Sequence, residues 1–511
     1  MIILQQTRGV LSSGDQLALD LPFAETKSLA ARIGPTPTFT RGSGATYVSS
    51  DGLLHGVDTS TTSNTIGTGS KTFTLAATAG QDQLYRTGDA VDASNGSNSM
   101  VGTVTSYTPS TQVLVCNITS VTGSGTFTSW RIGYRGPRFD HDPVSPFACR
   151  GLLIEEGRTN LFQYSEIFNE AASLNYWDST SANAVTSNQT ISPDGAVTAD
   201  LLTTSAAAFD CFVRRAINWV GSTQYSYSIF LKRGPSNHRY VGLYIGAGIT
   251  GSVQYPYFDF DNPTTVQIPS GTMVGTINST RVDAYPNGWY RVSVTFTTAA
   301  TPVTIFGGVY VATSNGTLPN TPTAGLDCYI WGIQAEAGSF PTSYIPTTTS
   351  ALARAADVCS ITGAAFSGLY NNAAGTLLSE ASIANLVGNN RGIVQIDDDL
   401  TNNFIRHVYG LTDGGFRSLI RANLDAQTQL SVIAGTASTI QKRVVAYEGT
   451  SFASSSNGAS VETATRTMPV GLNNIKIGYL FTGLFYLNGH IQSIRYYKKR
   501  LPNAKLQALT A

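Results

Sequence analysis

The sequence predicts an all-β protein: several β-sandwich domains of the jelly-roll or lectin-like kind in series, with an extended N-terminal arm. Thr, Val and Tyr recur at alternating positions in short runs, and clusters of Gly, Asn and Ser separate these runs. Charged residues make up 13% of the 511 residues, about half the usual share for soluble domains, and aromatic residues make up 10%. Disordered chains are highly charged and poor in aromatic residues, so the composition predicts folded domains.

The clearest strand is expected at the start of residues 327–346. Alternation there would place Tyr329, Trp331 and Ile333 on one face, and the opposite face is apolar as well. The pattern breaks at Gly338 and continues into a Pro- and Thr-rich segment, which favours extended backbone. We therefore expect the last strand of a β-sandwich, followed by an exit linker.

The same residues carry a resemblance. The string YIWGIQAEAGSFPTSYIPT, followed by RAAD, resembles the end of a carbohydrate-binding-module-like jelly-roll domain found in fibre, spike and minor structural proteins of tailed bacteriophages. GLLIEEGRTNLFQYSE (151–166) resembles the start of that domain, and FTRGSGATYVSSDGLLH (39–55) resembles the segment that precedes it. The resemblance covers residues from about 39 to 357 and implies a virion fibre or spike protein.

Residues 58–136 show repeated strand–turn–strand patterns. They separate two segments that are continuous in the similar phage proteins. An exposed turn tolerates an inserted domain, so we expect a small inserted β-sandwich. The predicted domains are 1–57 (arm and first part of a split module), 58–136 (insertion), 137–159 (second part of the module), 160–350 (jelly roll) and 351–511 (lectin sandwich).

The C-terminal domain is similar to concanavalin A-like, or laminin G-like, lectin sandwiches. The string LNGHIQSIRYYKKRLP (487–502) matches the final strand of that family, and Leu501-Pro502-Asn503 is expected to open a short helix.

Charge and composition limit the partners. Lys and Arg number 32, and so do Asp and Glu, with no basic run, so no nucleic-acid partner is expected. No apolar run reaches membrane-spanning length, and we expect no membrane insertion. Five scattered cysteines and a short, polar N-terminal stretch fit a protein assembled in the cytoplasm. We expect a virion component that is released by lysis.

Sugar-binding surfaces use Trp and Tyr rings, because an apolar ring stacks on the C–H face of a pyranose while polar neighbours take the hydroxyls. Trp289 is expected on the outward side of its strand, and the tyrosines in Gly-rich stretches are expected to line a groove. Packing inside the sandwich is the alternative for each ring. The candidate carbohydrate-binding residues are Trp289, Tyr240, Tyr244, Tyr255 and Tyr257.

The acidic run Asp397, Asp398 and Asp399, followed by two asparagines, is a candidate calcium site. Calcium prefers several oxygen ligands on a flexible loop, which lectin-like sandwiches often supply. A solvated turn is the alternative, and no cofactor is certain.

No enzymatic activity is expected. Glu155 and Glu156 are adjacent and would point to opposite faces of a strand, so they cannot act as an acid and base pair across one bond. The five histidines are scattered, and short motifs of hydrolases, metalloproteases and nucleotide-binding loops are absent.

The sequence thus predicts a tail fibre or spike protein that attaches to host-surface carbohydrate. We expect a homo-oligomer, a trimer by preference, in contact with other tail or capsid proteins. The alternatives are a head fibre or decoration protein of the capsid, and a polysaccharide-degrading tailspike.

Overall fold

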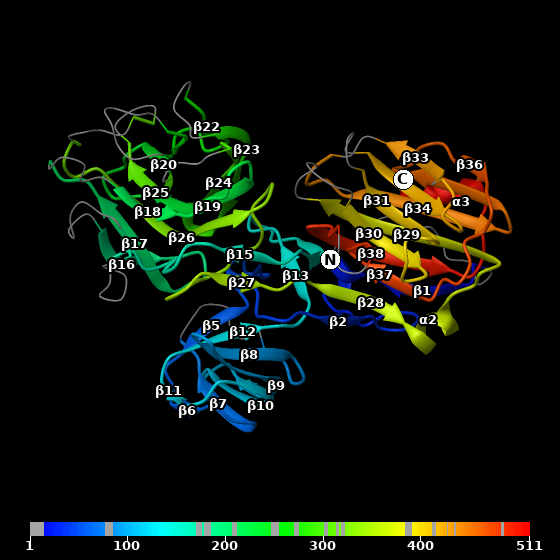
Figure 1. Ribbon diagram of the computed structural model, residues 1–511, viewed down its shortest axis with the longest axis horizontal. Helices are drawn as coiled ribbons and strands as arrows, with labels where there is room; N and C mark the ends of the chain where they lie inside the picture. Colours follow the sequence, from blue (N-terminus) through cyan, green and yellow to red (C-terminus); the bar gives the residue numbers. More distant parts are fainter. Residues whose placement is uncertain are drawn as a thin grey trace, which may run out of the picture.

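The computed structural model describes residues 15–76, 85–169, 176–177, 185–206, 212–246, 255–269, 275–300, 305–312, 316–317, 322–383, 391–410, 415–426, 428–433, 436–481 and 485–511. Two β-sandwich lobes lie side by side, and a smaller β-unit lies below them in the view of Figure 1. The predicted fold class, an all-β chain of several β-sandwiches, is confirmed. The start of the predicted arm, residues 1–14, lies outside the described residues.

The smaller unit is made of residues 57–134, drawn in blue and cyan in Figure 1. Its strands alternate buried apolar and exposed polar residues, as along β9 and β10, so one face of its sheet builds a core around Phe73, Leu114 and Trp130. The sheet order is β5 (Val57–Ser60), β12 (Trp130–Tyr134), β8 (Ala90–Asn95), β9 (Asn98–Thr108), β10 (Val113–Thr122) and β7 (Gly69–Thr74). A separate ladder pairs β6 (Asn64–Thr65) with β11 (Thr126–Phe127).

The jelly-roll lobe, in green, packs two antiparallel sheets face to face. One sheet has the order β16 (Val185–Ile191), β17 (Val197–Thr203), β26 (Asp327–Ala337), β19 (Gln224–Arg233), β24 (Trp289–Thr298) and β23 (Gly275–Tyr285). The other has the order β18 (Phe212–Ile217), β25 (Ile305–Val311), β20 (Tyr240–Gly246), β21 (Tyr257–Asp259) and β22 (Val266–Gln267). A 3-10 turn, η2 (Pro286–Gly288), joins β23 to β24.

The strand expected at residues 327–337 is present as β26, but its alternation is interrupted. Gly332 has φ +62°, and the pairing with β19 shifts register at this point. Such a bulge adds one residue to the strand, so Ile333 packs in the sandwich core with Ile330 and not beside Trp331. The predicted common face of Tyr329, Trp331 and Ile333 is therefore wrong for Ile333.

The C-terminal lobe, in yellow to red, recruits strands from the N-terminal part of the chain. One sheet has the order β13 (Arg138–His141), β14 (Cys149–Ile154), β38 (Gly489–Tyr497), β29 (Ala374–Ile383), β34 (Gln441–Glu448), β35 (Ser451–Ser456) and β36 (Glu462–Thr465), with β1 (Leu17–Leu21) also paired to β38. The facing sheet has the order β2 (Thr38–Thr40), β28 (Val358–Thr362), β37 (Asn474–Ile477), β30 (Arg391–Asp397), β31 (Phe404–Tyr409), β32 (Phe416–Arg421) and β33 (Thr428–Ile433).

These recruited strands change the organisation expected from the sequence. Leu19, Leu21 and Phe23 are fully buried in the core of the C-terminal lobe, together with Leu152 and Ile154. Residues 17–23 are thus an integral strand and turn, where the sequence predicted an arm with few contacts. The segments assigned to a split module add strands to both sheets of the sandwich predicted to start at residue 351.

Short elements complete the fold. The helices are α1 (Phe23–Thr26), α2 (Gly363–Leu369) and α3 (Asn503–Thr510), and the last of these opens directly after Pro502, where a helix was expected. Two small ladders lie between the lobes and the smaller unit: β3 (Tyr47–Val48) with β4 (Leu54–His55), and β15 (Arg158–Asn160) with β27 (Leu352–Arg354).

Candidate functional site

The outer face of one jelly-roll sheet is lined with tyrosines. Along β20 the residues Val241, Leu243 and Ile245 point into the sandwich core, so alternation sends Tyr240 and Tyr244 to the opposite face. Tyr257, the first residue of β21, and Tyr255, two residues before it, reach the same face. The structure thus brings together the four tyrosines that the sequence singled out.

The deeper part of this face is a closed aromatic layer. The Tyr244 and Tyr255 rings stack with their centroids 4.7 Å apart, and Tyr310 packs against both rings edge-on. Glycines make room for the rings: a Cβ on Gly242 would lie 1.9 Å from Tyr310 Cζ, and one on Gly246 would lie 2.4 Å from Tyr255 Cε1.

The prediction that Tyr244 and Tyr255 contact a sugar is therefore wrong. Their exposed fractions are 0% and 2%, so neither ring offers a face to a ligand. The Tyr244 hydroxyl also accepts a hydrogen bond from Arg214 Nη1 at 2.6 Å. These two rings support the surface from below, because close packing leaves them no space to turn outward.

Tyr240 and Tyr257 remain half-exposed at the edge of the layer. Their rings meet edge to face, with centroids 5.9 Å apart. The Arg239 guanidinium lies 4.9 Å from the centroid of the Tyr240 ring and grips Asp259 with two hydrogen bonds, Nε to Oδ1 at 2.7 Å and Nη2 to Oδ2 at 2.6 Å. We call Tyr240, Tyr257, Arg239 and Asp259 the tyrosine edge.

The charge state of the tyrosine edge is fixed by its ion pair. The hydrogen bonds from Arg239 lower the pKa of Asp259, so this carboxyl stays ionised at neutral pH. Burial raises the pKa of Tyr257, so its hydroxyl keeps its proton. The edge therefore presents apolar ring surfaces beside the Arg239 guanidinium, whose side chain is 44% exposed, while the buried Asp259 holds that guanidinium in place.

The prediction that Trp289 contacts a ligand is also wrong. The strand parity is as expected, because Val292, Val294 and Phe296 of β24 face the sandwich core and Trp289 faces away from it. However, the outer face is covered by the β3–β4 hairpin, and Trp289 is 1% exposed. Its indole N–H donates to the Ile191 carbonyl at 2.9 Å, so both the ring and its polar atom are occupied.

The acidic run of the C-terminal lobe holds a lysine in place of a metal ion. Lys476 Nζ lies 2.8 Å from both carboxylate oxygens of Asp397 and 2.8 Å from Asp399 Oδ1. Asp398 Oδ2 accepts from Asn403 Nδ2 at 3.0 Å. The calcium assignment for Asp397, Asp398 and Asp399 is corrected, because Lys476 takes the place of a cation between Asp397 and Asp399, and Asp398 is bonded to Asn403.

Among the residues that the structure describes, no group of three or more His, Cys, Asp or Glu side chains is arranged to hold a metal ion. No helix in the same described ranges is long and apolar enough to cross a membrane.

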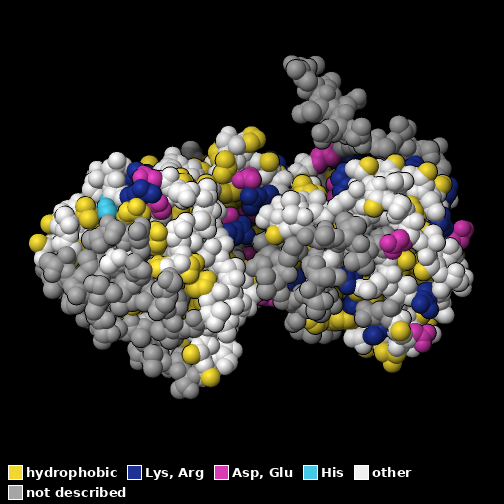
Figure 2. Space-filling model, turned by 90° about the horizontal axis from the view of Figure 1, so that it is seen from above, with side chains coloured by type: hydrophobic (Ala, Val, Ile, Leu, Met, Phe, Trp, Pro, Cys, Tyr) yellow, Lys and Arg dark blue, Asp and Glu magenta, His cyan; other side chains and the backbone are white. Residues whose placement is uncertain are grey.

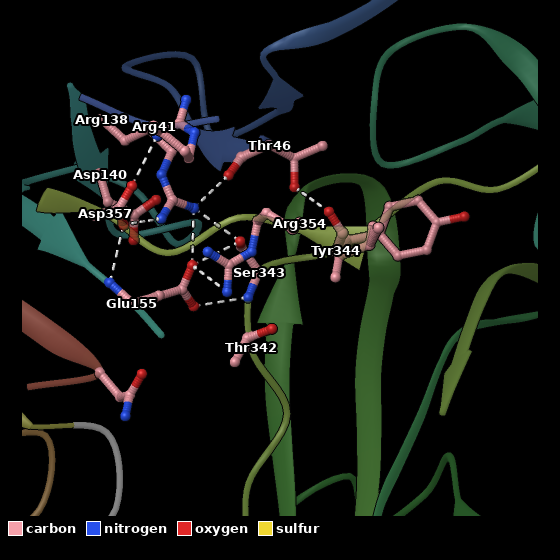
Figure 3. Close-up of polar contacts among 12 residues, drawn as sticks. Arg41, Thr46, Arg138, Asp140, Glu155, Thr342, Ser343, Tyr344, Arg354 and Asp357 are labelled. Atoms are coloured by element: carbon pink, nitrogen blue, oxygen red, sulfur yellow. Dashed lines mark hydrogen bonds and ion pairs between the residues drawn. The ribbon is translucent and has the colours of Figure 1, made fainter. Parts of the chain in front are cut away.

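A charged network that the sequence did not predict lies where the lobes and the smaller unit meet (Figure 3). Its five charged side chains are at most 5% exposed. They come from segments far apart in the chain, and we call them the junction cluster: Arg41, Arg138, Glu155, Arg354 and Asp357.

The junction cluster is closely paired. Arg138 Nη1 donates to Glu155 Oε2 at 2.8 Å, and Arg41 Nη1 donates to Asp357 Oδ1 at 2.9 Å. Ser343 donates to Glu155 from its backbone nitrogen at 2.8 Å and from its hydroxyl at 2.7 Å.

The pKa values of both buried acids reflect this pairing. Burial alone would raise the pKa of Glu155, but the charges of Arg354 and Arg138 outweigh burial and hold it far below its ordinary value. Arg138 and Arg41 likewise lower the pKa of Asp357 against the effect of burial. Both carboxylates of the junction cluster are already bonded within the protein, so we assign the cluster a structural role: it joins distant parts of the fold. The available sequence signal was the charge in the strings GLLIEEG and RAAD.

No family model matches the chain, and no curated protein matches it. Similar solved structures include the CBM40 domain of the Ruminococcus gnavus IT-sialidase bound to α2,3-sialyllactose. This match has 13% sequence identity and a TM-score of 0.25, and it covers 28% of this chain and 84% of that chain. Domains LG4-5 of the mouse laminin α1 chain match with 10% sequence identity and a TM-score of 0.20, and the match covers 59% of this chain and 92% of that chain. A heptameric SAP-like pentraxin from Limulus polyphemus matches with 11% sequence identity and a TM-score of 0.22, and the match covers 27% of this chain and 70% of that chain. Similarities at these identities and TM-scores carry no argument about ligand or function.

Proposed function

We propose that the protein binds carbohydrate and that the tyrosine edge makes the contact. The observation behind the proposal is the half-exposed pair Tyr240 and Tyr257 beside the bidentate Arg239–Asp259 pair. A pyranose ring would lie with its C–H face on a tyrosine ring and its hydroxyls toward the exposed guanidinium of Arg239.

The rigidity of the surface supports this proposal. Tyr240 rests on the buried layer of Tyr244, Tyr255 and Tyr310, and Asp259 is locked by two hydrogen bonds from Arg239. Rings and ion pairs that are already ordered lose little conformational entropy when a ligand binds. A single shallow site of this kind would still bind weakly, with a dissociation constant of about 1 mM, equivalent to about −4 kcal/mol.

At a finer level, we propose a tail fibre or spike protein of a tailed bacteriophage that attaches to host-surface carbohydrate without degrading it. The resemblance of residues 39–57 and 137–357 to phage structural proteins supports this assignment. A homo-oligomer, by preference a trimer, would present several weak sites to one cell surface. Linked sites raise the apparent affinity by about two orders of magnitude or more when geometry allows simultaneous binding.

The test is a glycan array and a host-cell pull-down with the full chain and the Tyr240→Ala/Tyr257→Ala variant. We expect the double variant to lose at least about tenfold in affinity, because both stacking surfaces are gone. Tyr107→Ala is the matched control: it removes a half-buried tyrosine ring from the smaller unit and leaves the tyrosine edge unchanged. Equal binding by both variants would contradict the proposal.

The same preparation separates the alternatives. Release of shorter oligosaccharides from a host polysaccharide would identify a degrading tailspike. Attachment of the labelled protein to the capsid, with no glycan bound by the unaltered chain, would identify a head fibre or decoration protein.

A further inference from the structure

A cleft lies between the jelly-roll lobe and the C-terminal lobe, with a volume of about 510 Å³. Figure 2 shows that basic and acidic side chains gather on the surface between the two lobes. We call this space the interlobe cleft. The jelly-roll lobe contributes Arg281 and Asp283 from β23, the β13–β14 hairpin contributes Asp142 and Arg150, and β38 contributes His490 and Gln492.

A smaller recess of about 100 Å³ adjoins the cleft. Its lining includes Arg150, Arg281, Asp283 and His490, which also line the cleft. The recess is walled by aromatic rings, among them the half-buried Tyr285. Ligand sites commonly have volumes of about 300–1,000 Å³ and often lie between domains, so both the size and the place of the cleft are those of a binding site.

The charged side chains of the cleft are paired with each other. Arg281 Nε donates to Asp283 Oδ1 at 2.9 Å, and Arg150 Nη2 donates to Asp142 Oδ2 at 3.1 Å.

The histidine follows the same pattern. His490 Nε2 lies 2.7 Å from Asp140 Oδ2, and Asp140 Oδ1 accepts from the backbone nitrogen of Val48 at 2.7 Å. The two Arg–Asp pairs carry no net charge, so these pairs leave no free counter-charge to attract a strongly charged ligand.

We propose that the interlobe cleft is a saccharide site for an uncharged sugar unit, separate from the tyrosine edge. A sugar hydroxyl both donates and accepts hydrogen bonds, and each Arg–Asp pair offers donors next to acceptors. Arg281 and Gln492 add donors from opposite lobes, so one sugar unit would contact both sandwiches at once.

Apolar surface in the same cleft fits the C–H groups of a sugar. Ile440 and Ala148 line the cleft, and both are exposed, Ile440 by 48%. A simple anion would gain nothing from these side chains, and a metal ion would find each nearby carboxylate already bonded to a cation or an imidazole. The mixture of paired charges and small apolar groups therefore favours a neutral polyhydroxylated ligand.

The experiment uses the full chain with Tyr240→Ala/Tyr257→Ala, which disables the tyrosine edge, on an array of neutral and acidic glycans. We expect residual binding to neutral glycans. Adding Ala148→Trp should weaken that binding at least tenfold, because Ala148 is exposed and lines the cleft, where an indole would fill the space. Ala373→Trp, at an exposed turn at the far end of β29, is the control and should bind like its parent.

Two outcomes overturn the proposal: the double variant binds no glycan while the unaltered chain binds, or Ala148→Trp binds as well as Ala373→Trp. A preference for acidic glycans would contradict the proposal that the site binds an uncharged sugar unit. The first outcome leaves the tyrosine edge as the sugar site, so failure of the cleft is distinguishable from failure of the proposed function.

Cys149 provides an independent readout, because it is half-buried and lines the cleft. Cys116, Cys328 and Cys359 are buried, and Cys211, which lies outside the described residues, is replaced by Ser. A neutral glycan selected on the array should slow maleimide labelling of Cys149 at least threefold. An unchanged labelling rate at saturating glycan would place the sugar elsewhere and overturn the cleft site.

Discussion

Arg138 Nη2 donates to Asp357 Oδ2 at 2.6 Å, across 219 positions of sequence. Arg138 begins β13, and Asp357 directly precedes β28, so the contact ties together the two sheets of the C-terminal lobe. Asp357 also accepts from Arg41 and from the backbone nitrogen of Glu155. One buried carboxylate therefore holds segments from three distant parts of the sequence.

Replacing this carboxylate should destabilise the whole protein. Asp357→Asn leaves Arg41 and Arg138 buried without their anion, a situation that typically costs about 3–5 kcal/mol. We expect that loss in the free energy of unfolding, measured by urea denaturation at pH 7. Glu25→Gln is the control, since Glu25 is 55% exposed in its pair with Arg32, and such pairs contribute about 0–1 kcal/mol. Similar losses in the two variants would contradict the role of the junction cluster.

A second prediction concerns pH. Burial and, next, the negative charge of Asp194 raise the pKa of Glu166 to about 8, although Tyr344 and Arg131 act in the opposite direction. Between its ordinary pKa of 4.5 and about 8, the folded protein keeps a proton on Glu166 that the unfolded chain releases. Stability from this group is therefore highest below pH 4.5 and falls as the pH rises to about 8.

Glu166→Gln should remove this decline and stabilise the protein at pH 8, by on the order of a few kcal/mol. The measurement is the free energy of unfolding at several pH values from 5 to 9. Glu448→Gln changes an exposed carboxyl and serves as the control. A decline of the same slope in Glu166→Gln and in the unaltered chain would show that Glu166 is not its source.

The sequence predicted local features well, because they depend on neighbouring residues. Alternation placed Trp289 on the side of β24 that faces away from the sandwich core, and the Gly-rich stretches singled out four tyrosines that share one sheet face. Alternation does not show what covers a face. The hairpin that buries Trp289 contains Val48 and Leu54, more than 200 positions earlier, and no local pattern connects them.

The recruited strands were missed for the same reason. The alternation in residues 17–21 predicted only an extended arm, because its partner β38 lies at the other end of the chain. The acidic run 397–399 shows the converse limit. Its carboxylates suggested a cation, and the cation is Lys476, which approaches from a strand that only the fold brings close. Pairing between distant segments decided each of these cases.

The third prediction follows from Lys476. Lys476→Met leaves the fully buried Asp397 without its countercharge and should lower the free energy of unfolding by about 3–5 kcal/mol. Lys71→Met, in the smaller unit, is the control and should stay within about 0.5 kcal/mol of the unaltered chain. Because the ammonium already lies between Asp397 and Asp399, neither calcium nor a chelator should change the melting temperature of the unaltered chain. A rise on adding calcium would restore the metal assignment.

The fourth prediction concerns the smaller unit. Its ends lie together: Val57 pairs with Gly133, and the Gly56 carbonyl accepts from the backbone nitrogen of Tyr134 at 2.8 Å. Opposite residues in an antiparallel pair are about 5 Å apart, so one or two glycines can replace residues 58–133. Keeping Tyr134 preserves the carbonyl that accepts from Arg41 at 2.7 Å.

The shortened chain should therefore fold, with a single cooperative melt for the two lobes and unchanged glycan binding at the tyrosine edge. The core of the smaller unit is made by its own residues, so its removal takes few apolar contacts from the lobes. Deleting residues 138–154 is the matched contrast, because Leu152 and Ile154 are fully buried in the C-terminal lobe and that variant should not fold. Calorimetry and light scattering distinguish the two. Aggregation of the 58–133 deletion would show that the lobes depend on the smaller unit for their stability.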